Sequence, residues 1–269
     1  MSTNFLTKNS IKRKLKSQFL WFRKYYYQGK SFTCPLCGNS FRTMLPGGFQ
    51  SDAVKKLDII GAGLRSQNIC PYCLSTDRDR LVYVYLRDIF SIKEKEIHVL
   101  HVSPEPALYR VLSTLPNITY TTGTKYAEGT YYPSGIEFFD LRELPYSNNT
   151  FDLVICNHVL EHIEEDYLAM AEIFRVLKNN GHAVLQVPIS EKLVDTLEDP
   201  DIKTQQDRHT VFGQFDHVRV YGQDYPSRLE HIGFSMEVIP SHRVKEQANV
   251  SVNFALNPRE NLYIAHKKL

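Results

Sequence analysis

Hydrophobic positions in the second half of the chain fall in short runs separated by amphipathic stretches. Five apolar runs of four to six residues predict strands, and two windows with apolar residues three and four apart predict helices. In chain order we expect a strand at 97–102, a helix at 106–115, strands at 118–122, 136–139 and 153–156, a helix at 166–178 and a strand at 182–187. Strands that alternate with helices predict a parallel sheet of βαβ units.

Two more apolar runs, at 235–239 and 262–265, follow without a helical pattern between them. Successive strands with no crossover helix predict an antiparallel hairpin at one edge of the sheet. The fold class expected is therefore α/β, with a doubly wound, mostly parallel, seven-stranded Rossmann-like sheet. In such sheets, ligands bind at the carboxyl ends of the strands.

The helix expected at 166–178 has an apolar stripe and a stop signal. The stripe consists of Leu168, Ala171, Phe174 with Ile173, and Leu177. Asn179-Asn180-Gly181 follows, and its glycine suits the positive φ that often ends a helix. We expect that stripe to pack on the sheet.

The first 30 residues predict a basic amphipathic helical arm. Ile11, Leu15, Phe19, Phe22 and Tyr26 recur on one helical face. Residues 1–51 contain nine Lys or Arg and no acid, whereas the remainder has 23 basic and 30 acidic side chains. Two readings are open: the arm docks on its own protein, or it binds an anionic surface such as a peripheral membrane or RNA.

Export and membrane spanning are not expected. The apolar run at 19–22 has only four residues and no small-residue cleavage site follows it. No apolar run approaches the roughly 18 residues that a membrane helix needs. We therefore expect a cytoplasmic protein without a transmembrane segment.

Four of the five cysteines form two matched pairs, Cys34-Pro-Leu-Cys37 and Cys70-Pro-Tyr-Cys73. Two such knuckles can supply four thiolates at the corners of a tetrahedron, so they predict a structural Zn²⁺ site in a zinc-ribbon-like module. The 32 residues between the pairs carry Pro46-Gly47-Gly48 and are expected to form a hairpin or loop. Two disulfides or unlinked thiols are the alternatives, and disulfides fit poorly without an export signal.

The composition fits one large globular domain with a small accessory module. The 269 residues are 42% hydrophobic and 23% charged, and only 13 are Gly and 13 Pro, which excludes collagen-like and Pro/Gly-rich disordered classes. We expect an arm at 1–30, a zinc-knuckle module with a connecting helix at 31–90, and a large α/β domain at 91–269.

Several motifs in this catalytic region resemble one enzyme family. They are DLRELP at 140–145, NTFDLVICNHVLEH at 149–162 and FRVLK at 174–178. They resemble class I S-adenosylmethionine-dependent methyltransferases of the type 11-like group. A bacterial subgroup with an N-terminal CPxC…CPxC module is similar over about 34–240, through the stretches 70–86, HVSPE at 101–105, QVPI at 186–189 and 212–229.

The resemblance implies S-adenosyl-L-methionine as the cofactor and a set of residues that hold it. Asp140 and Leu141 would receive the adenine, and Asn157 and His158 would lie beside the sulfonium. The remaining cofactor-binding residues expected are His101, Ser103 and Glu105.

Two features depart from the family pattern. The glycine-rich turn after the first strand is replaced by the HVSPE stretch, whose prolines remove backbone donors. The acid expected after the second strand to hold the ribose is missing. Three alternatives remain: Glu128 reaches back, Glu105 substitutes, or cofactor binding is weakened.

The sequence also offers candidates for a general base and for residues that bind the methyl acceptor. His217 and His158 are the candidate catalytic bases, since histidine titrates near neutral pH. Asp216, Arg219, Tyr221 and Tyr225 are candidate substrate contacts, with ordinary packing as the alternative. His158 and His162 flank Glu161 but lack the Glu that directly follows the first His in zinc hydrolases.

Three functions follow from this sequence. The first is a methyltransferase acting on an O or N atom of a saccharide or other small-molecule acceptor. The second is an RNA methyltransferase that uses the zinc module and the basic arm. The third is a non-catalytic binding module that keeps the fold without the cofactor.

Overall fold

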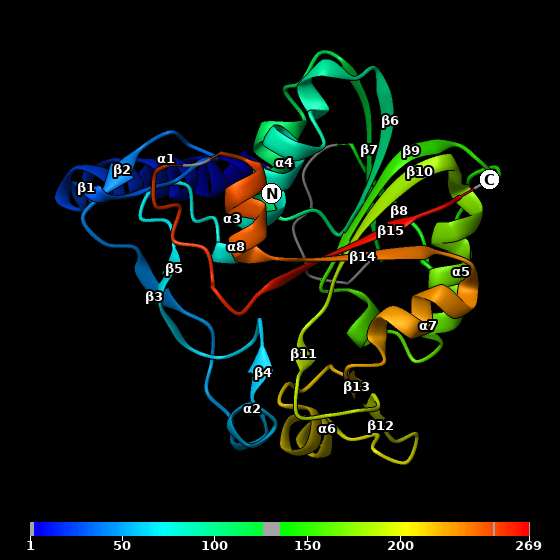
Figure 1. The fold of residues 1–269 in the computed structure, drawn as a ribbon. Helices are drawn as coiled ribbons and strands as arrows, with labels where there is room; N and C mark the ends of the chain where they lie inside the picture. The colour runs from blue at the N-terminus through cyan, green and yellow to red at the C-terminus, as the bar shows by residue number, and fades with distance from the viewer. Residues whose placement is uncertain (1–2, 126–134, 250, 269) are drawn as a thin grey trace.

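The computed structural model describes residues 3–125, 135–249 and 251–268, with side chains from residue 15 onward. Its centre is a seven-stranded sheet (Figure 1). From one edge to the other, the strands are β14 (Ser235–Pro240), β15 (Asn261–His266), β10 (Leu177–Gln186), β9 (Phe151–Asn157), β6 (Ile97–Val102), β7 (Ile118–Thr124) and β8 (Ile136–Phe138). This confirms the doubly wound, mostly parallel sheet.

Residues on each strand alternate between two apolar layers, as the two-residue period of a strand requires. On β9, Val154 and Cys156 face the layer beneath α5 (Asp166–Val176) and α7 (Tyr225–Ile232). Leu153 and Ile155 face the layer beneath α3 (Asp77–Val84), α4 (Pro106–Leu112) and α8 (Ser241–Gln247). Figure 1 shows these two helix groups on opposite sides of the sheet.

The C-terminal strands differ from a simple hairpin. β15 is antiparallel to both β10 and β14 and lies between them, so the antiparallel pair at the sheet edge is confirmed. The connection contains α8, which the sequence pattern did not predict. This helix is short, and Ser241 and Val244 are its buried residues, so it leaves little periodic signal.

The end and the buried face of α5 also differ from expectation. The helix ends at Val176, and Asn180 rather than Gly181 takes a positive φ, of 61°. Its buried apolar face consists of Ala169, Met170, Ile173 and Val176, whereas Leu168 is 55% exposed. The predicted stripe was therefore rotated by about one residue.

The N-terminal module consists of small paired strands and two helices. Here β1 (Gln28–Thr33) pairs with β2 (Ser40–Phe41), and β3 (Leu45–Gly47) pairs with β5 (Arg65–Ile69). Helix α2 (Asp52–Leu57) and strand β4 (Ile59–Ile60) lie between β3 and β5, and α3 continues into a π-helical turn at Tyr85–Ile89.

This module is tied to the segment that follows β10. Strand β4 pairs with β11 (Ile189–Ser190). β12 (Leu197–Glu198) pairs with β13 (Arg219–Val220), and α6 (Gln205–Phe212) packs on α2 through a cluster that includes Val54 and Phe212. The module therefore borders the carboxyl edge of the sheet.

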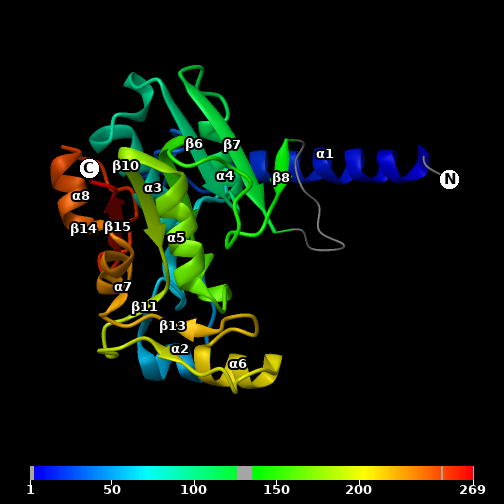
Figure 2. The same ribbon diagram turned by 90° about the vertical axis from the view of Figure 1, so that its right-hand side faces the viewer.

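The first helix, α1 (Thr3–Tyr26), projects from the body of the molecule (Figure 2). Its last turn is attached to the module, where Arg23 Nε donates to the Pro71 carbonyl and Lys24 Nζ lies 5.4 Å from the centre of the Tyr72 ring. The described part of the predicted apolar face is exposed: Leu15 59%, Phe19 61%, Phe22 67% and Tyr26 67%. The prediction that this face of the arm docks on its own protein is therefore wrong for the described residues.

A membrane-spanning helix is not found in the described part of the chain, because none there is both long and apolar enough.

Candidate functional site

The four predicted zinc ligands form one cluster. The Sγ atoms of Cys34, Cys37, Cys70 and Cys73 all lie within 4.8 Å of one another, and Cys34 Sγ is 3.5 Å from Cys73 Sγ. The cysteines are free thiols in the described residues, which excludes the disulfide alternative there. Four sulfur ligands grouped this closely fit the tetrahedral site that Zn²⁺ prefers.

The two knuckles have the same backbone geometry. Cys34 N donates to the Asn39 carbonyl at 2.9 Å, and Cys70 N donates to the Ser75 carbonyl at 2.8 Å. The fifth residue of each has a positive φ, 69° at Gly38 and 66° at Leu74. Such a repeated turn directs both sulfurs of a pair to the same side, so the backbone prepares a metal site.

A pocket of about 710 Å³ lies at the carboxyl ends of β6, β7, β8 and β9. Five of the predicted site residues line it: Ser103, Asp140, Leu141, His158 and Asp216. The rest of its lining includes Val102, Lys125, Phe139, Arg142, Val159, His162, Ile163, Glu164, Arg208 and Val218. The pocket therefore occupies the place where doubly wound sheets bind ligands.

Two non-glycine residues at this edge have left-handed backbone. Ser103, just after β6, has φ 47°, and His158, just after β9, has φ 54°. Such conformations are held by the surrounding structure and concentrate at functional sites. Here Ser103 N donates to the Gly123 carbonyl and His158 N to the Gln186 carbonyl, each at 2.7 Å.

Asp140 lies at the end of β8 and is paired with Arg142. Its carboxylate accepts from Arg142 Nε at 3.0 Å and from Nη2 at 2.8 Å, and the Arg142 backbone N–H donates to it at 3.0 Å. The hydrogen bonds from Arg142 lower the pKa of Asp140 to about 2. Asp140 is therefore ionised at neutral pH and keeps lone pairs for a further donor.

His101 is fully buried and pairs with the half-buried Glu105. Tyr120 Oη lies 2.7 Å from His101 Nδ1, and His101 Nε2 lies 2.8 Å from Glu105 Oε2. Burial raises the pKa of Glu105, but the hydrogen bond and charge of His101 outweigh it and the pKa is lowered. Neither residue lines the pocket among the described residues, so their cofactor-binding roles stay predictions.

At the end of β9, several buried polar atoms have no hydrogen-bond partner among the described residues. They are the amide oxygen and nitrogen of Asn157 and the Nε2 of His158. Arg78 Nη1 donates to His158 Nδ1 at 3.0 Å. Because arginine is only a donor, the neutral His158 ring carries its proton on Nε2. In this tautomer Nε2–H is a buried donor, and the role of His158 as a base stays a prediction.

Arg78 was not assigned a role from the sequence. It belongs to the 70–86 stretch, and α3 brings it across to the end of β9, 80 residues later in the chain. Its Nη1 also donates to the Gly61 carbonyl at 3.0 Å. The N-terminal module thus contacts a residue that lines the pocket, which one sequence without a known fold could not reveal.

Glu161, His162 and His217 come together at the same edge. Their ligand atoms lie within 4.8 Å of one another, and the His162 and His217 ring centres are 4.7 Å apart. Burial lowers the pKa of His217 to about 4. His217 itself is 5% exposed and its neighbours Asp216 and Val218 line the pocket, so its role as a base stays a prediction.

Arg219, Tyr221 and Tyr225 lie in the core instead of the pocket. Tyr221 Oη donates to Asp166 Oδ2 at 2.7 Å, and Tyr225 Oη donates to the Leu185 carbonyl at 3.0 Å. Arg219 is 3% exposed and donates to Glu198 Oε2 at 2.8 Å. These contacts support the packing alternative over the predicted substrate contacts.

Two hydroxyl groups lie close together where the resemblance predicts an acid. Ser103 Oγ and Thr124 Oγ1 are 2.8 Å apart, at the ends of β6 and β7. Glu128 lies outside the described residues, and Glu105 is held by His101.

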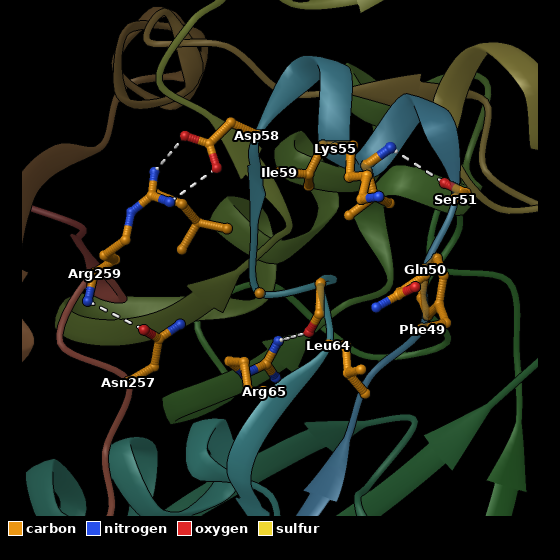
Figure 3. A pocket seen from close by; sticks show the side chains of 14 residues that line it. Phe49, Gln50, Ser51, Lys55, Asp58, Ile59, Leu64, Arg65, Asn257 and Arg259 are labelled. Carbon is orange, nitrogen blue, oxygen red and sulfur yellow. Dashed lines mark hydrogen bonds and ion pairs between the residues drawn. The ribbon is translucent and has the colours of Figure 1, made fainter.

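A second pocket of about 320 Å³ lies between α2, residues 59–65 and two residues of the C-terminal segment (Figure 3). Figure 3 shows Asp58 paired with Arg259 at its edge, with both oxygens accepting at 2.9 Å. Gly61 lines this pocket, and a Cβ built on it would lie 3.6 Å from Cε1 of His158, which lines the first pocket.

Comparison with known sequences finds a family match in the middle of the chain. A sequence model described as "Methyltransferase domain" matches residues 120–185, about a quarter of the chain. An uncharacterized protein of Methanocaldococcus jannaschii is 45% identical over 56 residues. That match covers 20% of this chain and 24% of the relative, so it spans about a quarter of the relative's length.

Solved structures with low identity are similar over most of the chain. A SAM-dependent methyltransferase from Archaeoglobus fulgidus is 13% identical, with 72% of this chain and 95% of that one covered and a TM-score of 0.44. A Burkholderia thailandensis 1,6-didemethyltoxoflavin-N1-methyltransferase with bound S-adenosylhomocysteine is 12% identical, with 70% and 78% covered and a TM-score of 0.45. The [4+2]-cyclase SpnF is 18% identical, with 71% and 81% covered and a TM-score of 0.44.

Proposed function

We propose that this protein is an S-adenosylmethionine-dependent methyltransferase whose methyl donor binds in the 710 Å³ pocket. The observation that carries the proposal is that Ser103, Asp140, Leu141 and His158, each expected to contact the donor, line one pocket at the carboxyl edge of a doubly wound sheet. The family match over residues 120–185 supports a methyltransferase domain.

The polar groups of the pocket fit such a donor. Asp140 can accept from the adenine amino group, and Leu141, 5% exposed, offers apolar surface to the ring. The Asn157 amide, without a partner in the described ranges, and the Nε2–H of His158 can meet the polar methionine end. The hydroxyls of Ser103 and Thr124 are our candidates for the ribose.

S-adenosylmethionine supplies an electrophilic methyl group when bound, so the protein contributes mainly by aligning an acceptor with it. The second pocket supports a saccharide or similar small polar molecule as that acceptor. Its lining combines polar side chains such as Ser51 and Lys55 with the half-exposed ring of Phe49. Gly61 in its lining lies next to His158 of the donor pocket, since a Cβ on Gly61 would lie 3.6 Å from His158 Cε1.

The donor proposal is tested by calorimetric titration of the zinc-loaded protein with S-adenosylhomocysteine. We expect micromolar binding, and about tenfold weaker binding for Asp140→Asn, because a hydrogen bond to a charged group contributes about 1.5–3 kcal/mol. The matched control is Asp201→Asn, an exposed carboxylate away from the pocket. A folded protein that does not bind would favour the non-catalytic function.

The acceptor proposal needs a separate test. In Lys55→Met, S-adenosylhomocysteine affinity should match that of the parent, and methyl transfer to a library of saccharides should fall. Transfer to RNA alone, with binding that weakens steeply as salt rises, would support the RNA function instead.

We propose that the four cysteines hold a structural Zn²⁺ ion. Ser75 supports this with its hydroxyl, 3.3 Å from Cys34 Sγ and 3.2 Å from Cys73 Sγ, where it can donate to a thiolate. Arg80 is fully buried and donates to the Ser75, Phe254 and Ala255 carbonyls, which links the site to the C-terminal segment.

We also propose that α1 attaches the protein to an anionic lipid surface. Its exposed aromatic side chains suit the membrane interface, and the helix contains Lys and Arg but no acid. The protein should co-sediment with phosphatidylserine vesicles. The double substitution of Phe19→Ser and Phe22→Ser should abolish this co-sedimentation. Binding to neutral and anionic vesicles alike, or retention by the variant, would refute it.

A further inference from the structure

The cluster of Glu161, His162 and His217 combines a carboxylate with two imidazoles next to the pocket. Glu161 and His162 belong to a short 3-10 turn, Leu160–His162, after β9, and His217 arrives from the segment between α6 and β13. Their ligand atoms lie within 4.8 Å of one another. His162 lines the pocket and is 30% exposed in its side chain, so the cluster is open on that side.

Glu161 is the most buried member of this group. It is 1% exposed, and its Oε2 has no hydrogen-bond partner among the described residues. A buried carboxylate without a full set of partners is costly, because its charge has been removed from water. Such an atom is expected where a ligand completes the site.

His162 has the orientation of a metal ligand. Its Nδ1 lies 3.2 Å from the Asp216 carbonyl oxygen and 3.4 Å from Asp216 Oδ2, so Nδ1 carries the proton and donates. Its Nε2 then has a free lone pair and faces Glu161 Oε1 at 4.0 Å, and the same oxygen lies 3.4 Å from His158 Nδ1. Two lone-pair-bearing atoms that face each other with no proton between them favour a cation in that space.

Asp216 fixes the orientation of the His162 ring through contacts with Nδ1. Histidine ligands commonly donate their other ring N–H to a carboxylate or carbonyl group, which fixes the tautomer and the ring orientation. Asp216 offers both groups to the same Nδ1 and is itself held by Gln214 Nε2 at 2.8 Å.

We propose that Glu161, His162 and His217 bind a divalent first-row transition-metal ion whose open positions face the pocket and take an oxygen atom of the methyl acceptor. The imidazole and carboxylate set suits manganese, iron, cobalt or zinc better than magnesium or calcium. The role of the acceptor oxygen rests on the proposed function, whereas the metal site does not. The acceptor class is then a hydroxyl compound, which the ion would orient.

The metal site is tested by titrating zinc-loaded protein with Co²⁺. We expect one additional ion per chain by elemental analysis, without the intense thiolate-to-cobalt absorption that binding at the cysteines would give. Glu161→Gln and His162→Asn should lose this ion, and Asp216→Asn should weaken its binding by roughly 10–100-fold. Because Glu161 is buried, the half-exposed His162 provides the variant that is safer for folding.

The matched control is His242→Asn, an exposed histidine on α8 that should leave binding unchanged. If the parent binds no second ion, or if both ligand variants bind it as the parent does, the proposal is wrong. Mn²⁺ replaces Co²⁺ to test the open positions: bound Mn²⁺ should enhance solvent proton relaxation, and no enhancement would exclude an open site.

Titration with S-adenosylhomocysteine on the same samples separates the two proposals. Donor binding without a second metal overturns the metal site alone. A second metal without donor binding overturns the proposed methyl donor and leaves the metal site standing.

Discussion

Glu260 gives the clearest test of how burial and charge work together in this molecule. It lies one residue before β15, is 3% exposed, and accepts one hydrogen bond, from Asn257 Nδ2 at 3.3 Å. Burial, with a smaller contribution from the charge of Asp77, raises its pKa to about 7 against the opposing charges of Arg78 and Arg65. At slightly acidic pH the folded protein therefore keeps this carboxyl protonated.

The sign of the effect on stability follows from the protons bound in each state. Between pH 4.5 and about 7, the unfolded chain has lost the Glu260 proton and the folded protein still holds it. Stability therefore falls as pH rises through this window. One unit of pKa corresponds to about 1.4 kcal/mol, so the full cost above pH 7 is about 3 kcal/mol.

Glu260→Gln should remove this slope, because the amide resembles the neutral acid and does not ionise. The free energy of unfolding would be measured in urea at about pH 5.5 and about pH 8, with zinc present. Over that interval the parent should lose about 2 kcal/mol more than the variant. Glu246→Gln, exposed on α8, is the control and should follow the parent. An equal pH dependence in parent and Glu260→Gln would show that the pKa of Glu260 is not raised in the folded protein.

Three further substitutions test separate parts of the molecule. Cys70→Ser should reduce zinc content from one ion per chain to none and lower the unfolding midpoint, because structural zinc contributes on the order of 10 kcal/mol; elemental analysis and thermal unfolding measure both. Arg78→Met should weaken S-adenosylhomocysteine binding about tenfold by calorimetry, since it frees His158 Nδ1 to take the proton. Gly123→Ala should destabilise the fold by about 1–3 kcal/mol in urea, since its Cβ would lie 2.1 Å from Phe139 Cε1.

Each of these has an outcome that contradicts it. Zinc retained by Cys70→Ser would exclude the four-cysteine site. Arg78→Met should be compared with Arg243→Met, exposed on α8, and equal affinities would remove Arg78 from the site. Unchanged stability of Gly123→Ala would mean that the Phe139 ring moves aside freely.

The sheet was predictable because its strands leave local signals. The runs at 97–102 and 118–122 are apolar and β-branched, and they appear as β6 and β7 with the same first residues. The sequence did not predict helix α8 or the end of α5, because a short helix or a helix end contains few apolar residues at helical spacing. The exposed face of α1 was misjudged because an apolar stripe does not say whether anything covers it.

The sequence located residues of the pocket only where a motif directly follows a strand. Ser103, Asp140 and His158 each follow a strand, and parallel strands bring such ends to one edge of a sheet. Tyr221 and Tyr225 were misplaced, because a loop sequence does not reveal that their hydroxyls are satisfied in the core. The approach of His217 to Glu161 depends on tertiary packing and leaves no mark in sequence spacing.

The most direct test of the proposed donor site is a crystal structure of the zinc-loaded protein with S-adenosylhomocysteine. We expect ligand density in the pocket at the carboxyl ends of β6–β9, with the adenine against Leu141 and its amino group near Asp140. Ligand density outside this pocket, or an empty pocket in crystals grown with saturating ligand, would contradict the proposed site.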